Sequence, residues 1–305
     1  MMNRRNFTYS AFLTGLGLSA TPSLFANSGV ATTHKYNLKY APHLGMFKHS
    51  AGDDPIDQLN FMADQGFTAF EDNNIHTRPI ATQEKMAATM QKRSLAMGVF
   101  VAYKDFKNPT LTRGKADDRY EFLRQIEAAV PVAKRVNAKW VTVVPGTVDM
   151  KLVEDYQTAN VIESLKQAAD IFEPHDIVMV LEPLNWFRNH AGLFLRESPQ
   201  AFQICKAVNS PSCKILFDIY HQQIQEGNLI PNIEKCWDEI GYFQIGDNPG
   251  RNEPTTGEIN YKNIFKYIHS RGFDGIMGME HGNSRPDKAG EMAVIEAYKK
   301  VDNFL

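Results

Sequence analysis

Short apolar runs recur along this chain and alternate with longer segments whose apolar residues repeat at helical spacing. Apolar runs of this length fit strands of a parallel sheet that is covered on both faces. Eight strand–helix units in a chain of this size are what a single (β/α)8 barrel requires. The expected strands lie near 38–46, 67–71, 96–103, 139–144, 177–182, 213–218, 241–246 and 275–280.

The segments between these runs predict helices. Residues 55–65 end at Gly66, a common helix stop, and residues 117–136 place Leu123, Ile126 and Val130 at helical spacing. Further helices are expected over 152–173, 198–208, 260–270 and 287–303.

Nothing in the body of the chain suggests a second domain. No linker or block of charge divides it, so we expect one TIM barrel domain over 36–305. A doubly wound open sheet is the alternative, because periodicity does not reveal whether a sheet closes. No G-x-G-x-x-G sequence follows the first expected strand, which argues against a dinucleotide-binding sheet.

The first residues differ from the rest in charge. No charged residue occurs from Asn6 to Thr33, and Arg4 and Arg5 stand just before this stretch. An Arg-Arg pair ahead of a short apolar run resembles a twin-arginine leader, which we expect over residues 1–26. The expected location is then the periplasm, or the cytoplasm if the leader is not used. A membrane-retained anchor is the other alternative, although Gly and Thr make this run a poor spanning helix.

Charge and cysteine content narrow the function classes. With 33 Lys and Arg against 35 Asp and Glu, the net charge is −2, so no domain-wide basic field favours nucleic acid. Cys205, Cys213 and Cys236 form no CxxC pair, which argues against a structural zinc site. We expect three buried thiols, with a Cys205–Cys213 disulfide as the alternative after export.

Polar residues close several of the expected strands. Apolar runs lead directly to Glu182, Asp218, Gln244 and Glu280. In a barrel, the carboxyl ends of the strands meet at one face, where the active site lies. Carboxylate and amide oxygens are ligands for Mg²⁺ or Mn²⁺. Structural ion pairs are the alternative, but burying several unpaired carboxylates would be costly. His221 and His281, close to two of these ends, could equally be helix-capping or hydrogen-bonded residues.

The same residues lie in longer motifs that resemble the hydroxypyruvate isomerase family, a branch of the xylose isomerase-like TIM barrels. The matching segments run from about 177 to 282 and keep their order and spacing. They are LEPLN at 181–185, FDIYHQQIQEGNL at 217–229, QIGDNPGRNEP at 244–254, GEINY at 257–261 and GME at 278–280.

The resemblance implies a (β/α)8 barrel and one divalent metal ion, most simply Mg²⁺ or Mn²⁺. It assigns the metal to Glu182, Asp218, Gln244 and Glu280, with Glu182 and Glu280 also acting as the acid/base pair. The remaining residues that it assigns are substrate contacts at His221, Arg251, Glu253 and Glu71.

Some positions depart from the family pattern. His281 stands where a tyrosine commonly follows the last glutamate, and the segments 43–47 and 72–76 look unusual. These positions would line the substrate side of the barrel, so they bear on which substrate is used.

The predicted function is metal-dependent isomerisation of a small hydroxy-carbonyl or sugar-derived compound. The family's reaction is hydroxypyruvate to tartronate semialdehyde, through an enediolate. A periplasmic keto-sugar epimerase or a lyase on the same site is the alternative, and phosphodiester hydrolysis would need more histidine ligands. A non-enzymatic sugar-binding protein is a further alternative. The sequence does not fix an oligomeric state, and a homo-oligomer stays open.

Overall fold

The computed structural model describes residues 34–305. The predicted leader over residues 1–26 lies outside the described residues. Within 34–305, no helix combines the length and the apolar character that a membrane crossing needs.

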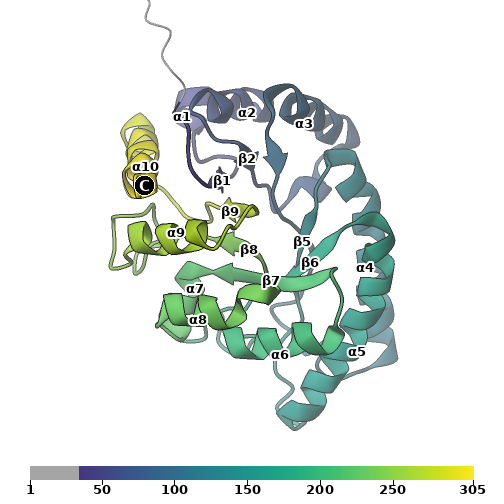
Figure 1. Cartoon of the computed structure of the whole chain (residues 1–305). Helices are drawn as coiled ribbons and strands as arrows, with labels where there is room; N and C mark the ends of the chain where they lie inside the picture. Colours follow the sequence, from purple (N-terminus) through teal and green to yellow (C-terminus); the bar gives the residue numbers. More distant parts are fainter. Residues whose placement is uncertain (1–33) are drawn as a thin grey trace, which may run out of the picture. The chain divides into compact units, whose positions relative to one another are not determined.

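Parallel strands form the inner layer of the fold (Figure 1). A seven-stranded sheet has the order β1-β9-β8-β7-β6-β5-β4, and a two-stranded sheet pairs β2 with β3. Every strand pair is parallel. The strands are β1 (Lys39–Ala41), β2 (Ala69–Phe70), β3 (Ala96–Met97), β4 (Phe100–Lys104), β5 (Trp140–Val144), β6 (Val178–Leu181), β7 (Cys213–Asp218), β8 (Ile240–Gln244) and β9 (Ile276–Gly278).

The small sheet fills the gap between the two ends of the large one. A parallel bridge joins His43, just after β1, to Glu71, just after β2. The predicted strand over 96–103 is divided at Gly98 into β3, which pairs with β2, and β4, which pairs with β5. A Cβ on Gly98 would lie 2.4 Å from the hydroxyl of Tyr242, so glycine permits this close approach. The strands therefore form the predicted α/β barrel rather than an open doubly wound sheet.

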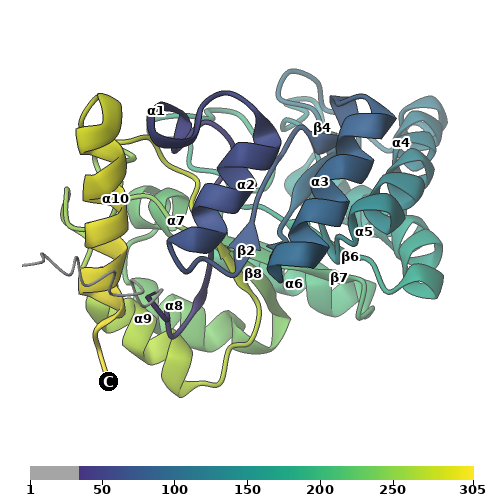
Figure 2. The same cartoon turned by 90° about the horizontal axis from the view of Figure 1, so that it is seen from above.

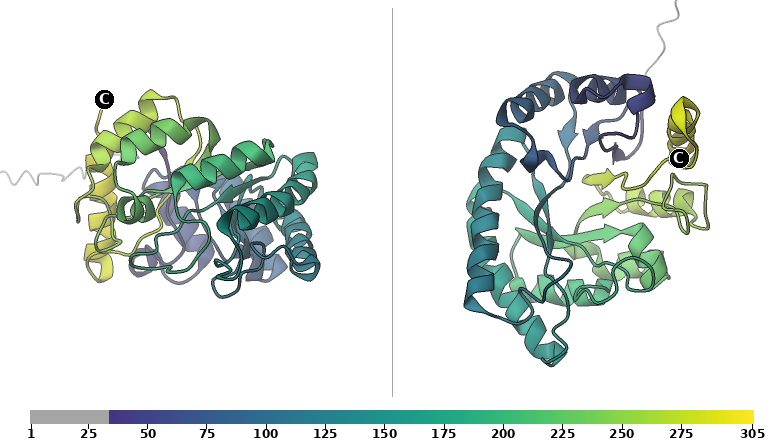
Figure 3. Two further views of the ribbon diagram at one scale, coloured as in Figure 1. Left: turned by 90° about the horizontal axis from the view of Figure 1, so that it is seen from below. Right: turned by 180° about the vertical axis from the view of Figure 1, so that it is seen from behind.

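Helices surround the strands on the outside (Figures 2 and 3). Asp54 caps α2, because its carboxylate accepts a hydrogen bond of 2.8 Å from the N–H of Ile56. Gly66, two residues after α2, has φ +92°, and a Cβ there would collide with the carbonyl of His34. The helices are α1 (Lys48–Ala51), α2 (Pro55–Asp64), α3 (Ile80–Arg93), α4 (Ala116–Val136), α5 (Glu154–Phe172), α6 (Ser198–Val208), α7 (Ile219–Gln225), α8 (Leu229–Cys236), α9 (Tyr261–Ser270) and α10 (Asp287–Asp302).

The six predicted helices are present within two residues of their expected ends, whereas α1, α3, α7 and α8 were not predicted. The buried face of α3 consists of Gln83, Met86 and Met90, so its apolar stripe is thin and interrupted.

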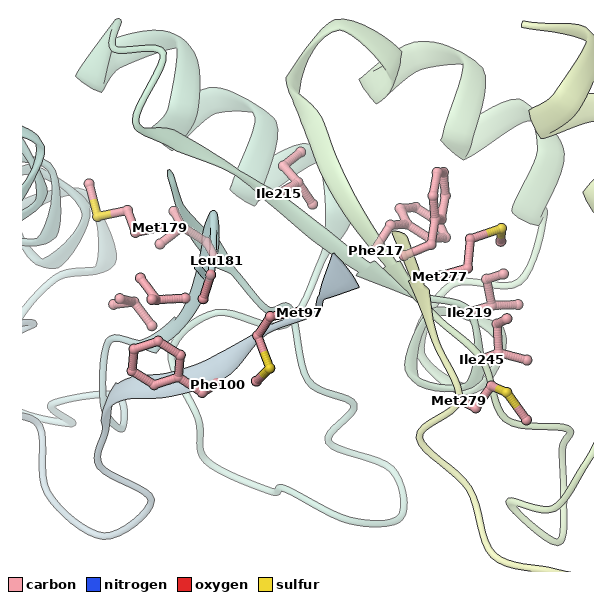
Figure 4. Packing of buried hydrophobic residues seen from close by; sticks show 14 of the residues in the cluster. Met97, Phe100, Met179, Leu181, Ile215, Phe217, Ile219, Ile245, Met277 and Met279 are labelled. Carbon is pink, nitrogen blue, oxygen red and sulfur yellow. The ribbon is translucent and has the colours of Figure 1, made fainter. Parts of the chain in front are cut away.

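The core has an outer and an inner part. The outer part packs strand residues against the helices and includes Met179, Phe217 and Met277 (Figure 4). The inner part is a separate cluster inside the barrel, formed by Ala41, Ala69, Val99, Val180, Leu216, Tyr242 and Ile276. Because side chains alternate between the faces of a strand, the next inward positions belong to the end of the barrel where the strands terminate. Cys205, Cys213 and Cys236 are free and buried, as expected.

Candidate functional site

Four polar residues follow members of the inner core cluster along the chain. Glu182, Asp218 and Gln244 come two positions after Val180, Leu216 and Tyr242, and Glu280 comes four positions after Ile276. Asp218 lies opposite Gln244 in the strand register, and Gln244 lies opposite Gly278. The period of two along a strand thus delivers these side chains to one end of the barrel interior.

The carboxylates form a compact cluster with a histidine. One atom each from Glu182, Asp218, His221 and Glu280 can be chosen so that all lie within 4.8 Å of one another. Among residues 34–305 this is the one group of His, Cys, Asp and Glu side chains with a geometry that could hold a metal ion. Gln244 lines the same cavity as Glu182, His221 and Glu280.

The two oxygens of the Asp218 carboxylate have different partners. Its Oδ1 accepts hydrogen bonds from the N–H groups of Tyr220, at 2.7 Å, and His221, at 3.2 Å, and so caps α7. Its Oδ2 lies 3.6 Å from Nε2 of His221 and 3.4 Å from Nη2 of Arg251. The helix therefore fixes one oxygen and leaves the other directed into the cluster.

Neighbouring hydrogen bonds define which ring nitrogen of His221 carries a proton. The Oδ1 of Asn185 accepts from the N–H groups of Arg188 and Asn189, so the other end of this amide is a donor. That Nδ2 lies 2.6 Å from Nδ1 of His221, which must accept. Burial, followed by the charge of Arg251, lowers the pKa of His221 well below its usual value. His221 is therefore neutral, and its buried Nε2–H, which has no hydrogen-bond partner within residues 34–305, faces the carboxylates.

Gln244 presents an oxygen to the cluster. Its Nε2 donates to Oε1 of Glu71 at 3.0 Å, while its Oε1 is buried and has no hydrogen-bond partner among the described residues. A buried carbonyl oxygen without a partner is unfavourable unless a ligand satisfies it. Together with the carboxylates of Glu182, Asp218 and Glu280, this oxygen completes a set of four hard donors, which suits a divalent cation. His221, whose Nε2 carries the proton, does not offer a lone pair to a metal there.

The carboxylates disfavour one another's ionisation. Burial, followed by the charges of Glu280 and Asp218, raises the pKa of Glu182 well above its usual value. Burial also raises the pKa of Asp218 and of Glu280, while the nearby Arg251 guanidinium opposes the shift in both. Two buried carboxyl groups, Glu182 and Asp218, and the partly exposed Glu280 share one guanidinium, so an added cation would stabilise their ionised forms.

Arg251 reaches the cluster from the loop after β8. Its Nη2 lies 2.7 Å from Oε2 of Glu280, and its guanidinium lies 4.8 Å above the ring of Tyr220. The predicted substrate contact Arg251 is thus at the cavity, where it holds Glu280 in place.

Two other predicted substrate contacts, Glu71 and Glu253, accept hydrogen bonds from other residues of the protein. Both oxygens of Glu71 are engaged, Oε2 by the hydroxyl of Tyr242 at 2.8 Å and Oε1 by Gln244. Burial, followed by the charge of Glu280, raises the pKa of Glu71 to about 8. Glu71 lines an adjoining cavity of about 270 Å³, rather than the one that contains Glu182.

Glu253 lies in the same loop as Arg251, after β8. It is buried, its carboxylate accepts hydrogen bonds from the N–H of Ser284, at 2.9 Å, and from the Ser284 hydroxyl, and it does not line the cavity. It ties the Arg251 loop to the loop after β9. The role of Glu253 as a substrate contact stays a prediction, and in the structure its carboxylate joins two loops.

The cavity at this end of the barrel has a volume of about 280 Å³. Sequence reasoning missed two polar residues that line this cavity, Lys104 at the end of β4 and His190 in the loop after β6. Asn73 lines both this cavity and the adjoining one, and its Nδ2 donates to Glu280 at 3.3 Å. Lys104 closes an apolar strand, so the rule that identified Glu182 would also have found it. Asn73 belongs to the segment 72–76, which was expected on the substrate side, whereas His190 carries no comparable signal.

A larger cavity of about 880 Å³ lies at the opposite end of the barrel, beside Ala96, Trp140 and Val178, near the strand beginnings. None of the predicted site residues lines it. Because the catalytic groups of such barrels lie at the carboxyl ends of the strands, the smaller cavity is the candidate site.

Comparisons with known proteins agree with this fold. The family model described as Xylose isomerase-like TIM barrel matches residues 59–301. The chain is 34% identical over 170 residues to hydroxypyruvate isomerase of Escherichia coli K12, covering 56% of this chain and 66% of that protein. It is 34% identical over 165 residues to 2-oxo-tetronate isomerase of Pectobacterium atrosepticum, covering 54% and 63% of the two chains. The matches thus span slightly less than two thirds of each relative's length.

A solved structure has the same fold over nearly its whole length. The crystal structure of AP endonuclease, family 2, from Brucella melitensis superposes with a TM-score of 0.72 at 25% identity. The superposition covers 83% of this chain and 96% of the other.

Proposed function

Because the chain belongs to the xylose isomerase-like TIM barrel family, we propose that it is a metal-dependent isomerase of a small hydroxy-carbonyl compound. The observation that carries this proposal is the set of four oxygen donors at the ends of consecutive strands. One of them is a buried carbonyl oxygen that has no hydrogen-bond partner in the part of the chain that the structure describes. The resemblance to hydroxypyruvate isomerases, first drawn from motifs, is matched by relatives that bear this name.

The residues that would hold the ion are Glu182, Asp218, Gln244 and Glu280, and Mg²⁺ or Mn²⁺ suits their oxygens. The chemistry that such an ion supplies when bound is stabilisation of negative charge on neighbouring substrate oxygens. The protein's own part is to hold the donors around one small space and to exclude bulk water from it.

Isomerisation moves a proton between two adjacent carbons, and two carboxylates can carry it. One of Glu182 and Glu280 removes a proton from the carbon that bears the hydroxyl group, and the other protonates the former carbonyl carbon. The hydroxyl proton passes to the former carbonyl oxygen, so that the hydroxyl and carbonyl groups exchange places. His221 contributes a neutral Nε2–H, which would donate to a substrate oxygen between the glutamates. Arg251 keeps the Glu280 carboxylate in one orientation through its 2.7 Å contact.

We further propose that the substrate is a keto acid. Lys104 and Arg251 are the cations that line the cavity, and Arg251 is already paired with Glu280 and Asp218. Lys104 has no carboxylate partner within 4.0 Å among the described residues; its Nζ lies 5.8 Å from the Phe106 ring centroid. A substrate carboxylate would supply the missing partner. Two relatives are named for acids of this kind, hydroxypyruvate and 2-oxo-tetronate.

Export remains part of the proposal. Under a twin-arginine leader over residues 1–26, the substrate would be a sugar-derived acid met in the periplasm. A keto-sugar epimerase is the second candidate, because a base on each face of one carbon would invert that carbon. The position of Lys104 favours an acid over a neutral sugar.

Other classes fit the described site less well. A nuclease of the related kind would use more histidine ligands and more than one metal ion, whereas residues 34–305 contain one candidate cluster with one histidine. A sugar-binding protein would not require two mutually repelling glutamates at the centre of its cavity.

The test begins with the metal content of the purified protein. Activity is then assayed on hydroxypyruvate, 2-oxo-tetronate and a neutral keto-sugar, with added Mn²⁺ and with a chelator. The proposal expects metal-dependent conversion of an acid and no conversion by Glu182→Gln. A metal-free protein that converts none of these compounds after Mn²⁺ is added would contradict it.

A further inference from the structure

Glu71 is buried in the barrel, in contact with the candidate metal ligand Gln244. Its carboxylate lies between Tyr242, whose hydroxyl donates to Oε2, and Gln244, whose Nε2 donates to Oε1. A Cβ on Gly278 would lie 2.0 Å from Oε2 of Glu71, so the glycine leaves the space that this carboxylate occupies. Glycine at 278 and hydrogen bonds from β8 thus hold Glu71 in one place.

The amide of Gln244 has two chemically different ends. Rotation by half a turn about its last bond would exchange Oε1 and Nε2, and a donor would then face the cavity. In the structure Nε2 donates to Glu71, and Oε1 is buried without a hydrogen-bond partner among the described residues. The Gln244 side chain lines the same cavity as Glu182 and Glu280. The acceptor at residue 71 therefore decides which end of the amide reaches the cavity.

We propose that Glu71 is a positioning residue that fixes the orientation of the Gln244 amide, so that its oxygen rather than its nitrogen is offered to the cation. An amide carries an oxygen at one end and a nitrogen at the other, so it needs a hydrogen-bond partner that fixes which end faces the cation. This inference rests on the proposed metal site. It assigns Glu71 a role different from the substrate contact that the sequence predicted.

Three variants of the full chain test the hydrogen bond between Glu71 and Gln244. Glu71→Gln replaces an acceptor with an amide, Gln244→Glu places two carboxylates in contact, and the double variant exchanges the partners. In the double variant the new Nε2 at 71 donates to the new carboxylate at 244, and Tyr242 still donates to residue 71. Mn²⁺ binding to metal-free protein is measured by titration calorimetry, with circular dichroism as the check on folding.

Each single change is expected to weaken Mn²⁺ binding about tenfold or more, as loss of a partner to a metal ligand commonly does. The double variant is expected to bind within about threefold of the unaltered protein, because the hydrogen bond is restored in reverse. Unaltered affinity in Glu71→Gln, or a loss in the double variant equal to the product of the single losses, would overturn the inference.

A second cycle covers the case in which Gln244→Glu does not fold. In a Gln244→Ala background no amide remains to be oriented, so Glu71→Gln should change Mn²⁺ affinity by less than about twofold. An equal loss in both backgrounds would mean that Glu71 acts only on structure, which contradicts the proposal. Failure of the unaltered chain to bind Mn²⁺ would contradict the metal site itself, and is distinguishable from these outcomes.

Discussion

The guanidinium of Arg251 lies 2.7 Å from the carboxylate of Glu280, although the two residues come from different loops at the end of the barrel. The same guanidinium lies 3.4 Å from Asp218. Its charge opposes the rise in pKa that burial causes at Glu182, Asp218 and Glu280.

Arg251→Met should lower kcat/KM by about a hundredfold or more, because a charge-assisted contact that orients Glu280 is lost. Arg251→Lys keeps the charge without the fork of donors and should recover only part of this loss. Steady-state kinetics of both variants measure the effect. Equal activity in the Arg251→Met variant, the Arg251→Lys variant and the unaltered protein would show that the contact between Arg251 and Glu280 has no catalytic consequence.

Glu182→Gln should abolish turnover and raise the stability of the metal-free protein. The raised pKa of Glu182 means that its ionised form destabilises the fold near neutral pH, and the amide removes this charge. For a protein of this size, each 1 kcal/mol gained raises the Tm by about 2 °C or more. Thermal unfolding at pH 7 with a chelator measures this, and a lower Tm in the variant would contradict it.

Lys104→Met should raise the KM for keto acids by about tenfold or more, the usual effect of losing a hydrogen bond to a charged group. The KM for a neutral keto-sugar should not change. Lys107→Met is the matched control, since Lys107 is exposed nearby and does not line the cavity. An equal change for acid and neutral substrates would argue that Lys104 does not bind a substrate carboxylate.

His281 should make the protein less stable below pH 6.5. Burial lowers the pKa of His281 to about 3. Its two ring nitrogens form hydrogen bonds with the carbonyl of Gly282 and with the hydroxyl of Tyr298. Between pH 3 and the ordinary value of 6.5, the unfolded chain binds a proton that the folded chain does not, so stability falls as the pH falls. At pH 5 the free energy of unfolding is lower by about 2 kcal/mol than at neutral pH.

His281→Gln can keep both hydrogen bonds and does not titrate. The Tm of both proteins is measured in the presence of a chelator at pH 7 and at pH 5. As the pH is lowered, the Tm of the unaltered protein should fall further than the Tm of the variant. Parallel stability curves for the two proteins would contradict the assignment.

The sequence predicted most of the barrel because strand and helix periodicities are local properties. It also predicted the strand-end residues Glu182, Asp218, Gln244 and Glu280, because each follows directly on an apolar run. The missed helix α3 carries a thin apolar stripe, and its burial depends on neighbours that the pattern does not reveal.

Loop residues were harder to predict for a physical reason. Glu253 lies in a motif beside Arg251, yet its carboxylate is held by Ser284, 31 residues away in the sequence. The direction of a loop side chain depends on such long-range partners. The same holds for Glu71, whose partners Tyr242 and Gln244 lie on a strand more than 170 residues later.

The central claim is that Glu182 and Glu280 move a proton beside a carbonyl group. The most direct measurement is deuterium uptake from D₂O into hydroxypyruvate or 2-oxo-tetronate, followed by NMR in the presence of Mn²⁺. The unaltered protein should incorporate deuterium at the carbon next to the carbonyl, and Glu182→Gln and Glu280→Gln should not. Uptake that persists in both variants, or no uptake by the metal-loaded unaltered protein, would contradict the account.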